Sequence, residues 1–118
     1  MPAKLSTHVL DTANGCPASG MKIELWSLDG EQRHRITTTL TNADGRTEAP
    51  LLSDTQMRAG HYELLFFVGD YYAARSADLP AVRFLDIVPV RFGLAEPDAS
   101  YHVPLLCTPW AYSTYRGS

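Results

Sequence analysis

The chain has 118 residues, of which 45% are hydrophobic and 19% are charged, and its formal net charge is −3. This length predicts a single domain over residues 1–118 that buries a hydrophobic core without disulfides or metal ions. The mild acidity argues against a nucleic-acid partner, and no apolar run reaches the roughly 18 residues that a membrane span requires.

The N-terminus and the two cysteines indicate where the protein works. Residues 1–8 contain no apolar segment of the kind found in signal peptides. Cys16 and Cys107 lie 91 positions apart and form no CxxC motif. One long-range disulfide stays open as an alternative, but two reduced thiols fit better, so the sequence predicts a cytoplasmic protein.

Eight prolines and eight glycines leave little room for long helices, and the stretches between them alternate as short strands do. In the first half of the chain we expect strands at residues 5–11, 21–28, 35–41 and 48–52. Turns are predicted at Asn14-Gly15, at Asp29-Gly30 and over residues 42–45.

In the second half, strands are expected at residues 62–68, 84–92, 101–106 and 110–116, with a short helix over 70–77. The strand at 62–68 is apolar on both faces apart from Glu63, which predicts that its second face is covered by another element or subunit. Pro89 places the strand at 84–92 near a sheet edge or at a bulge. These elements predict an all-β fold: an antiparallel β-sandwich of about eight strands in two sheets, with one short helix.

Strand alternation sets two histidines apart from the core. His102 lies opposite Val103 in its strand, and His8 lies opposite Val9 in the first strand. Both imidazoles therefore point outward if the valines face the core, and they meet if their strands are neighbours. The alternative is a pair of solvated surface histidines.

Arg46 follows the turn at 42–45, and by composition alone it is a solvated loop residue. The sequence contains no GxSxG, no HExxH, no glycine-rich phosphate loop and no EF-hand spacing. Unaided, these residues predict a β-sandwich and assign no chemistry to it.

Four segments carry a family resemblance: residues 5–11 (LSTHVLD), 41–46 (TNADGR), 101–106 (YHVPLL) and the closing tetrapeptide 115–118 (YRGS). On these segments and on residues 84–93, the chain resembles the 5-hydroxyisourate hydrolases, the transthyretin-like enzymes of urate breakdown. The resemblance covers essentially the whole chain. The closing tetrapeptide separates these hydrolases from transthyretins.

The resemblance implies a transthyretin-like sandwich and a homotetramer, a dimer of dimers with active sites in a channel between the dimers. It places the first strand beside the strand that carries His102. It also implies hydrolysis of 5-hydroxyisourate to 2-oxo-4-hydroxy-4-carboxy-5-ureidoimidazoline, without metal or cofactor. In this reading His8, Arg46, His102 and Ser118 are catalytic, and His8, Arg46 and Tyr115 bind the substrate.

Which histidine acts as general base stays open at this point, with a preference for His8. The alternative function is a non-catalytic transthyretin-like carrier of a small aromatic ligand, and a structural or adhesion module is a third possibility. The tetrapeptide at 115–118 speaks against the carrier, because carriers of this family lack it.

Overall fold

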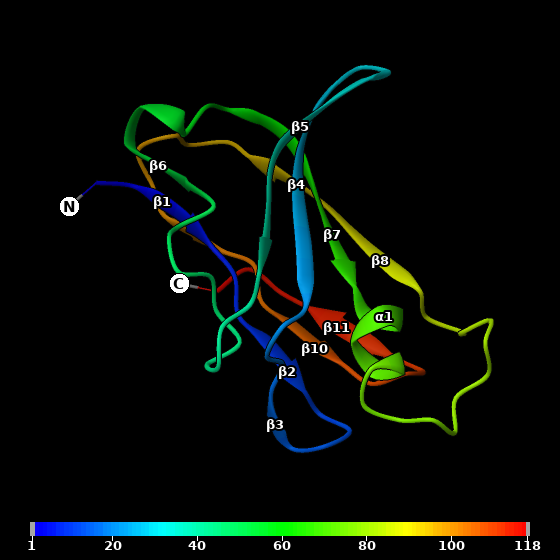
Figure 1. The fold of residues 1–118 in the computed structure, drawn as a ribbon. Helices are drawn as coiled ribbons and strands as arrows, with labels where there is room; N and C mark the ends of the chain where they lie inside the picture. The colour runs from blue at the N-terminus through cyan, green and yellow to red at the C-terminus, as the bar shows by residue number, and fades with distance from the viewer. Residues whose placement is uncertain (1, 118) are drawn as a thin grey trace.

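The computed structural model describes residues 2–117, which form eleven strands, one short α-helix and one 3₁₀ turn (Figure 1). The strands are β1 (Lys4–Ser6), β2 (Val9–Asp11), β3 (Cys16–Pro17), β4 (Lys22–Asp29), β5 (Gln32–Leu40), β6 (Leu52–Ser53), β7 (Gly60–Phe67), β8 (Ile87–Leu94), β9 (Tyr101–His102), β10 (Leu105–Cys107) and β11 (Tyr112–Thr114). The 3₁₀ turn η1 (Asp54–Gln56) follows β6, and helix α1 (Val68–Ala73) follows β7. No helix within residues 2–117 is long and apolar enough to cross a membrane.

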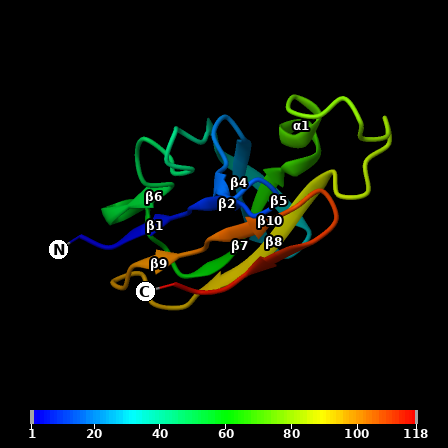
Figure 2. The ribbon, with the colours of Figure 1, turned by 90° about the horizontal axis from the view of Figure 1, so that it is seen from below.

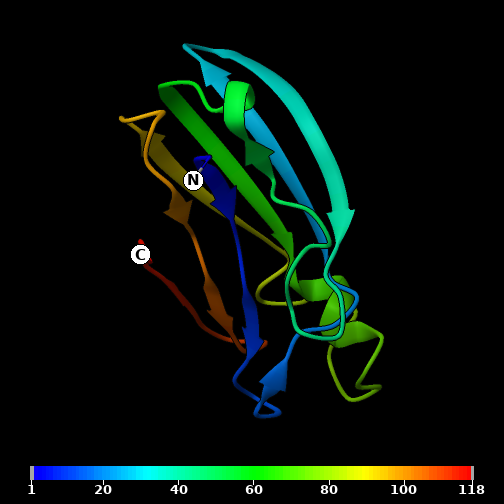
Figure 3. The same ribbon diagram turned by 90° about the vertical axis from the view of Figure 1, so that its left-hand side faces the viewer.

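The strands form two layers that face each other (Figure 3). One layer is an antiparallel sheet with the order β5-β4-β7-β8. The other consists of two small sheets, β6-β1-β9 and β11-β10-β2-β3, which continue each other because β1 leads into β2 and β9 into β10. The predicted β-sandwich with one short helix is confirmed. Two pairings depart from the antiparallel pattern, since β1 with β9 and β2 with β10 run parallel.

The predicted strands at 5–11 and 101–106 are each broken in the middle, at the same level of the sheet. The buried Thr7 side chain donates its hydroxyl to the Val103 carbonyl over 2.7 Å, where a regular ladder would use backbone amides. Pro104 has no N–H group with which to continue a ladder. The breaks explain why about eight predicted strands become eleven shorter ones.

The core lies between the two layers and follows the predicted alternation. Across β4 and β7, Ile23 pairs with Phe66 and Leu25 pairs with Leu64, and all four side chains are fully buried. Full burial of a side chain of this size contributes about 1.5–3 kcal/mol each. The other fully buried apolar residues include Leu5, Val9, Met21, Val68 and Leu105.

Several element boundaries differ from the predicted ones. β6 covers only Leu52–Ser53 and β8 begins at Ile87, because the preceding residues form loops. Helix α1 begins at Val68 and ends at Ala73, earlier than the predicted range. The edge position of Pro89 is confirmed, since β8 pairs only with β7 among the described strands.

The second face of β7 is covered by side chains from neighbouring strands of this same chain, which is the first of the two predicted kinds of cover, another element or a subunit. Glu63 is buried on this face, with its carboxylate 2.6 Å from the Arg33 guanidinium and 2.8 Å from that of Arg91. The ammonium group of Lys22 lies 4.5 Å from the ring centre of Phe67. These charged groups shield the half-buried apolar residues of this face.

A buried carboxylate ties helix α1 to strand β2. The Asp11 side chain accepts the hydroxyl protons of Tyr71 (2.8 Å) and Tyr72 (2.7 Å) and an amide proton of Asn14 (2.8 Å). Burial by itself raises the pKa of Asp11, but these hydrogen bonds outweigh it and hold the pKa below its usual value. Burial and the contact with Asp11 in turn raise the pKa of both tyrosines.

Substituting Asp11→Asn should remove the charge and leave at least one tyrosine hydroxyl without an acceptor. We expect the free energy of unfolding in urea to fall by about 2–3 kcal/mol at neutral pH. Asp78→Asn, which changes an exposed loop carboxylate, is the matched control and should stay within about 0.5 kcal/mol of wild type.

The same comparison has a defined pH dependence. The pKa of Asp11 is lower in the folded than in the unfolded chain. The carboxylate therefore adds to the free energy of unfolding at pH values above the usual carboxyl pKa, and this contribution is lost as the pH falls through the folded-state pKa. The stability gap between wild type and Asp11→Asn should therefore narrow in acid. A gap that widens would contradict this account of Asp11.

Candidate active site

Two parallel pairings bring distant segments onto one face of the sandwich (Figure 2). β1 lies beside β9 with Ser6 opposite His102, and β2 continues beside β10. Leu5 and Val9 are fully buried, whereas His8 and His102 are half-buried on the other side of their strands. Both imidazoles thus avoid the core, as the alternation predicts.

The imidazole of His8 is held by the turn at 42–46. Its Nε2 atom lies 2.8 Å from the carbonyl oxygen of Asp44. A carbonyl oxygen only accepts hydrogen bonds, so Nε2 carries a proton and donates it. The side chain of Asn42 closes the turn by accepting the amide protons of Asp44 (2.9 Å) and Arg46 (3.1 Å). One turn therefore fixes both the ring of His8 and the backbone of Arg46.

Gly45 holds this turn against β2. Its φ is +74°, and a Cβ atom there would lie 2.4 Å from the carbonyl oxygen of Val9. The amide of Val9 donates to the Gly45 carbonyl over 2.8 Å. Only glycine combines this backbone conformation with so close an approach. The contact keeps the Asp44 carbonyl within reach of His8.

Within residues 2–117, His102 has one ring nitrogen against Ser6 and no partner for the other. Its Nδ1 atom lies 2.9 Å from Ser6 Oγ, and no residue within 2–117 forms a hydrogen bond with its Nε2. Burial lowers the pKa of His102, and the nearby charges of Arg46 and His8 lower it further, while a backbone hydrogen bond with Ser6 acts in the opposite direction. The ring is therefore predominantly neutral at pH 7, the state in which it can accept a proton.

The guanidinium of Arg46 is available for a ligand. The residue is exposed, and its guanidinium forms no ion pair or hydrogen bond with the residues that the structure describes. Its influence on the pKa of His102 places its charge near that imidazole. A fork of N–H donors beside two imidazoles suits a ligand rich in carbonyl or anionic oxygens.

After β11 the chain returns to the strand that carries His102. The amide of Gly117 donates to the His102 carbonyl over 2.7 Å, and a Cβ atom on Gly117 would lie 2.7 Å from His102 Cδ2. The guanidinium carbon of Arg116 lies 4.1 Å from the ring centre of Tyr101. The segment before residue 118 is thus packed against β9 rather than frayed.

Tyr115 lines a hollow to which neither imidazole of its own chain contributes. Its side chain is 60% exposed and lines a hollow with Val90 and Tyr101, and no contact among the described residues joins it to either imidazole. Ser118, also predicted to belong to the site, lies outside the described residues. The structure therefore brings three predicted site residues together and leaves Tyr115 separate within one chain.

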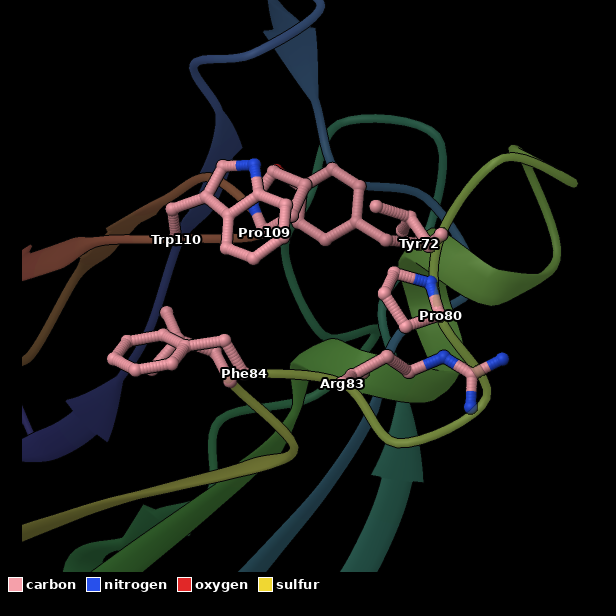
Figure 4. A pocket seen from close by; sticks show the side chains of 9 residues that line it. Tyr72, Pro80, Arg83, Phe84, Pro109 and Trp110 are labelled. Atoms are coloured by element: carbon pink, nitrogen blue, oxygen red, sulfur yellow. The ribbon is translucent and has the colours of Figure 1, made fainter.

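No metal site accompanies this group in the part of the chain that the structure describes, where no three His, Cys, Asp or Glu side chains could hold an ion. A separate hollow of about 10 Å³ lies near helix α1 and is lined by residues that include Tyr72, Arg83, Phe84 and Trp110 (Figure 4). It contains none of the predicted site residues, so it is not the candidate site.

Sequence reasoning did not single out Ser6, Asn42 or Gly45. Ser6 stands two positions before His8, so strand alternation alone puts it on the imidazole face. The order Asn-x-Asp-Gly over residues 42–45 is typical of a turn closed by an asparagine side chain, as observed here.

A family model described as HIUase/Transthyretin family matches residues 5–117. The chain belongs to this family. Over 115 residues it is 56% identical to a protein of Pseudomonas aeruginosa named 5-hydroxyisourate hydrolase, a match that covers 98% of this chain and 91% of that protein.

Solved structures agree with this membership of the HIUase/transthyretin family. A 5-hydroxyisourate hydrolase of Klebsiella pneumoniae superposes with a TM-score of 0.80 at 32% identity, covering 98% of this chain and 99% of that one. An (S)-allantoin synthase superposes with a TM-score of 0.93 at 46% identity. The match covers 99% of this chain but 44% of the synthase, so this chain spans less than half of that protein.

An NMR titration of this family member should find the midpoint of His102 below the ordinary histidine value, because burial and the charges of Arg46 and His8 oppose protonation. Arg46→Gln removes one of those charges and should move the midpoint back toward the ordinary value. Arg35→Gln, on the other layer of the sandwich, should leave it unchanged. A wild-type midpoint above the ordinary value would contradict the burial argument.

Proposed function

We propose that this chain hydrolyses 5-hydroxyisourate, opening its six-membered ring at an amide bond to give 2-oxo-4-hydroxy-4-carboxy-5-ureidoimidazoline, a step in urate breakdown. The observation that carries the proposal is the shared face on which two strand pairs and one turn present His8, His102 and Arg46. The relatives named 5-hydroxyisourate hydrolase support the identity of the substrate.

Ring opening makes three chemical demands. Water must lose a proton to become a nucleophile, the attacked carbonyl oxygen gains negative charge, and the leaving nitrogen needs a proton. A neutral imidazole meets the first demand, and as an imidazolium it meets the third by returning the proton to the nitrogen as the C–N bond breaks. A guanidinium meets the second demand because it stays charged throughout.

We assign the general base to His102, although the sequence alone favoured His8. The Nε2 atom of His8 already donates to the Asp44 carbonyl, which leaves only Nδ1, the nitrogen nearer its own backbone, for a ligand. His102 keeps Nε2 without a partner among the described residues, and its lowered pKa keeps the ring neutral, so that one of its nitrogens can accept a proton at neutral pH. His8 then orients the substrate, and Arg46 stabilises the oxyanion.

We further propose that the chain forms a homotetramer, a dimer of dimers with the active sites between the dimers. β8 and β11 are the outer strands of the two layers and lie on the same side, where their free edges can pair with another copy (Figure 2). Near one end of these strands Val82, Phe84 and Trp110 are 90%, 72% and 58% exposed. Apolar surface of this kind marks a contact between proteins.

A shared site gives Tyr115 and Ser118 a place in the reaction. Tyr115 lines a hollow to which neither imidazole of its own chain contributes, so it would bind substrate at a site that another subunit helps to form. Ser118, the next residue after Gly117 in the sequence, would offer its hydroxyl to the substrate. The carrier alternative fits less well, because a guanidinium and two imidazoles supply the charge and the proton-transfer groups that hydrolysis requires and that carriage of a ligand does not.

The two cysteines support a cytoplasmic location for this enzyme. Cys16 is exposed and Cys107 is buried, and both are free thiols. Free thiols are typical of proteins that work in a reducing compartment.

The variants His8→Ala, Arg46→Ala and His102→Ala should each lower turnover of freshly generated 5-hydroxyisourate by about 100-fold or more, because each removes one of the three functions. The absorbance decay of the substrate, with and without protein, measures this. His34→Ala, an exposed histidine on β5, is the matched control and should keep the wild-type rate.

Sedimentation of the same samples should report four subunits at micromolar concentration for wild type and for all variants. An active monomer would contradict the shared site. Unchanged substrate decay in the presence of wild-type protein would instead favour the carrier.

Truncation after Thr114 should abolish turnover with little loss of thermal stability. It removes the proposed contacts of Tyr115 and Ser118, whereas the core residues stay in place. Arg116→Ala, which loses only the stacking on Tyr101, should retain most of the rate. A truncated protein with full turnover would remove residues 115–118 from the site.

A further inference from the structure

We infer that Ser6 is a positioning residue for His102: it holds the imidazole proton on Nδ1, so that Nε2 presents its lone pair to the attacking water. The contact that carries this inference is the distance of 2.9 Å between Ser6 Oγ and His102 Nδ1. The inference rests on the proposed hydrolysis and adds a residue to its machinery.

The backbone fixes this contact. Ser6 and His102 are opposite each other in the parallel pairing of β1 with β9, and the Val103 amide donates to the Ser6 carbonyl over 2.9 Å. On its other side the His102 ring packs against Gly117, where a Cβ atom would come within 2.7 Å of Cδ2. The ring is thus confined between a hydroxyl and a glycine, and it cannot turn Nδ1 away from Ser6 without displacing one of them.

The hydroxyl of Ser6 is the group that can fix where the proton of the His102 ring resides. A neutral imidazole carries one proton, and the nitrogen that holds it is set by the hydrogen bond that the ring makes. Ser6 Oγ lies 2.9 Å from Nδ1 and can accept its proton, which leaves the lone pair of the neutral ring on Nε2.

This arrangement matters because only one tautomer works as a base toward the ligand. With the proton on Nδ1, the free Nε2 can take a proton from water, and the resulting imidazolium keeps its bond to Ser6. With the proton on Nε2, the ring would offer a donor where the reaction needs an acceptor. Ser6 therefore affects the chemical step more than substrate binding.

The test combines Ser6→Ala with Ser6→Thr, which keeps a hydroxyl on a strand residue. Ser27→Ala is the matched control, a half-buried strand serine on the other layer. ¹⁵N NMR of the ring should show a protonated Nδ1 and an unprotonated Nε2 in wild type and a mixture of tautomers in Ser6→Ala. The kcat of Ser6→Ala should fall by about 3- to 10-fold with little change in KM, the effect of losing one hydrogen bond. Ser6→Thr should restore both readouts, and Ser27→Ala should change neither.

An unprotonated Nδ1 in the wild-type spectrum would overturn the inference, as would a Ser6→Ala variant with wild-type kcat and unchanged ring nitrogens. Failure of the proposed function is recognised separately. It would appear as a wild-type protein that does not accelerate substrate decay, while the NMR comparison still reports whether Ser6 holds the Nδ1 proton.

Discussion

The parallel pairing of β1–β2 with β9–β10 is the constraint on which the rest of the site depends. Ser6 and His102 are 96 positions apart in the sequence, yet the register places them opposite each other. Parallel strands have no tight turn to bring them together, so the pairing is set by the core residues behind it. Leu5, Val9 and Leu105 are completely buried, and shifting the register by one residue would turn the imidazoles into the core.

Each histidine is held through a different ring nitrogen, and this difference separates their proposed roles. His8 gives its outer nitrogen to the Asp44 carbonyl, whereas His102 is held through the nitrogen nearer its backbone. Two glycines allow the backbone to approach closely enough for these contacts to form. Gly45 lets the turn at 42–46 pack against β2, and Gly117 packs on the ring of His102. Two residues of the same type, side by side on one surface, thus differ in the nitrogen they offer a ligand.

Much of the fold could be predicted from the sequence, because it depends on local patterns. The alternation in β4 and the turn at Asp29-Gly30 are short-range signals, and both appear where expected. The breaks at Thr7 and Pro104 and the parallel direction of β1 depend on contacts between remote residues, which no local pattern encodes. The charged cover of β7 was missed for the same reason, since Glu63 meets Arg33 and Arg91 only after the strands pair.

The candidate site also has features that the sequence predicts and features that only the folded structure shows. Alternation predicts that His8 and His102 point away from the core, and the family resemblance adds Arg46. The hydrogen bond from His8 to a backbone carbonyl is invisible in the sequence, because a carbonyl is present at every residue and only the folded turn selects Asp44. The hydroxyl of Ser6 could have been recognised from its place two residues before His8.

The long separation between β1 and β9 also dictates an order of events during folding. While the chain is being synthesised, β4, β5 and β7 can pair as soon as they emerge, because their partners are near in sequence. β1 can pair with β6 once Leu52 and Ser53 exist, but its pairing with β9 must wait for Tyr101 and His102, so this closure spans the longest loop. Until then, Leu5 and Val9 lack the cover that β9 and β10 provide. The same closure that buries these residues also assembles the two imidazoles, so a nascent chain acquires its chemistry and its protection from aggregation in one step.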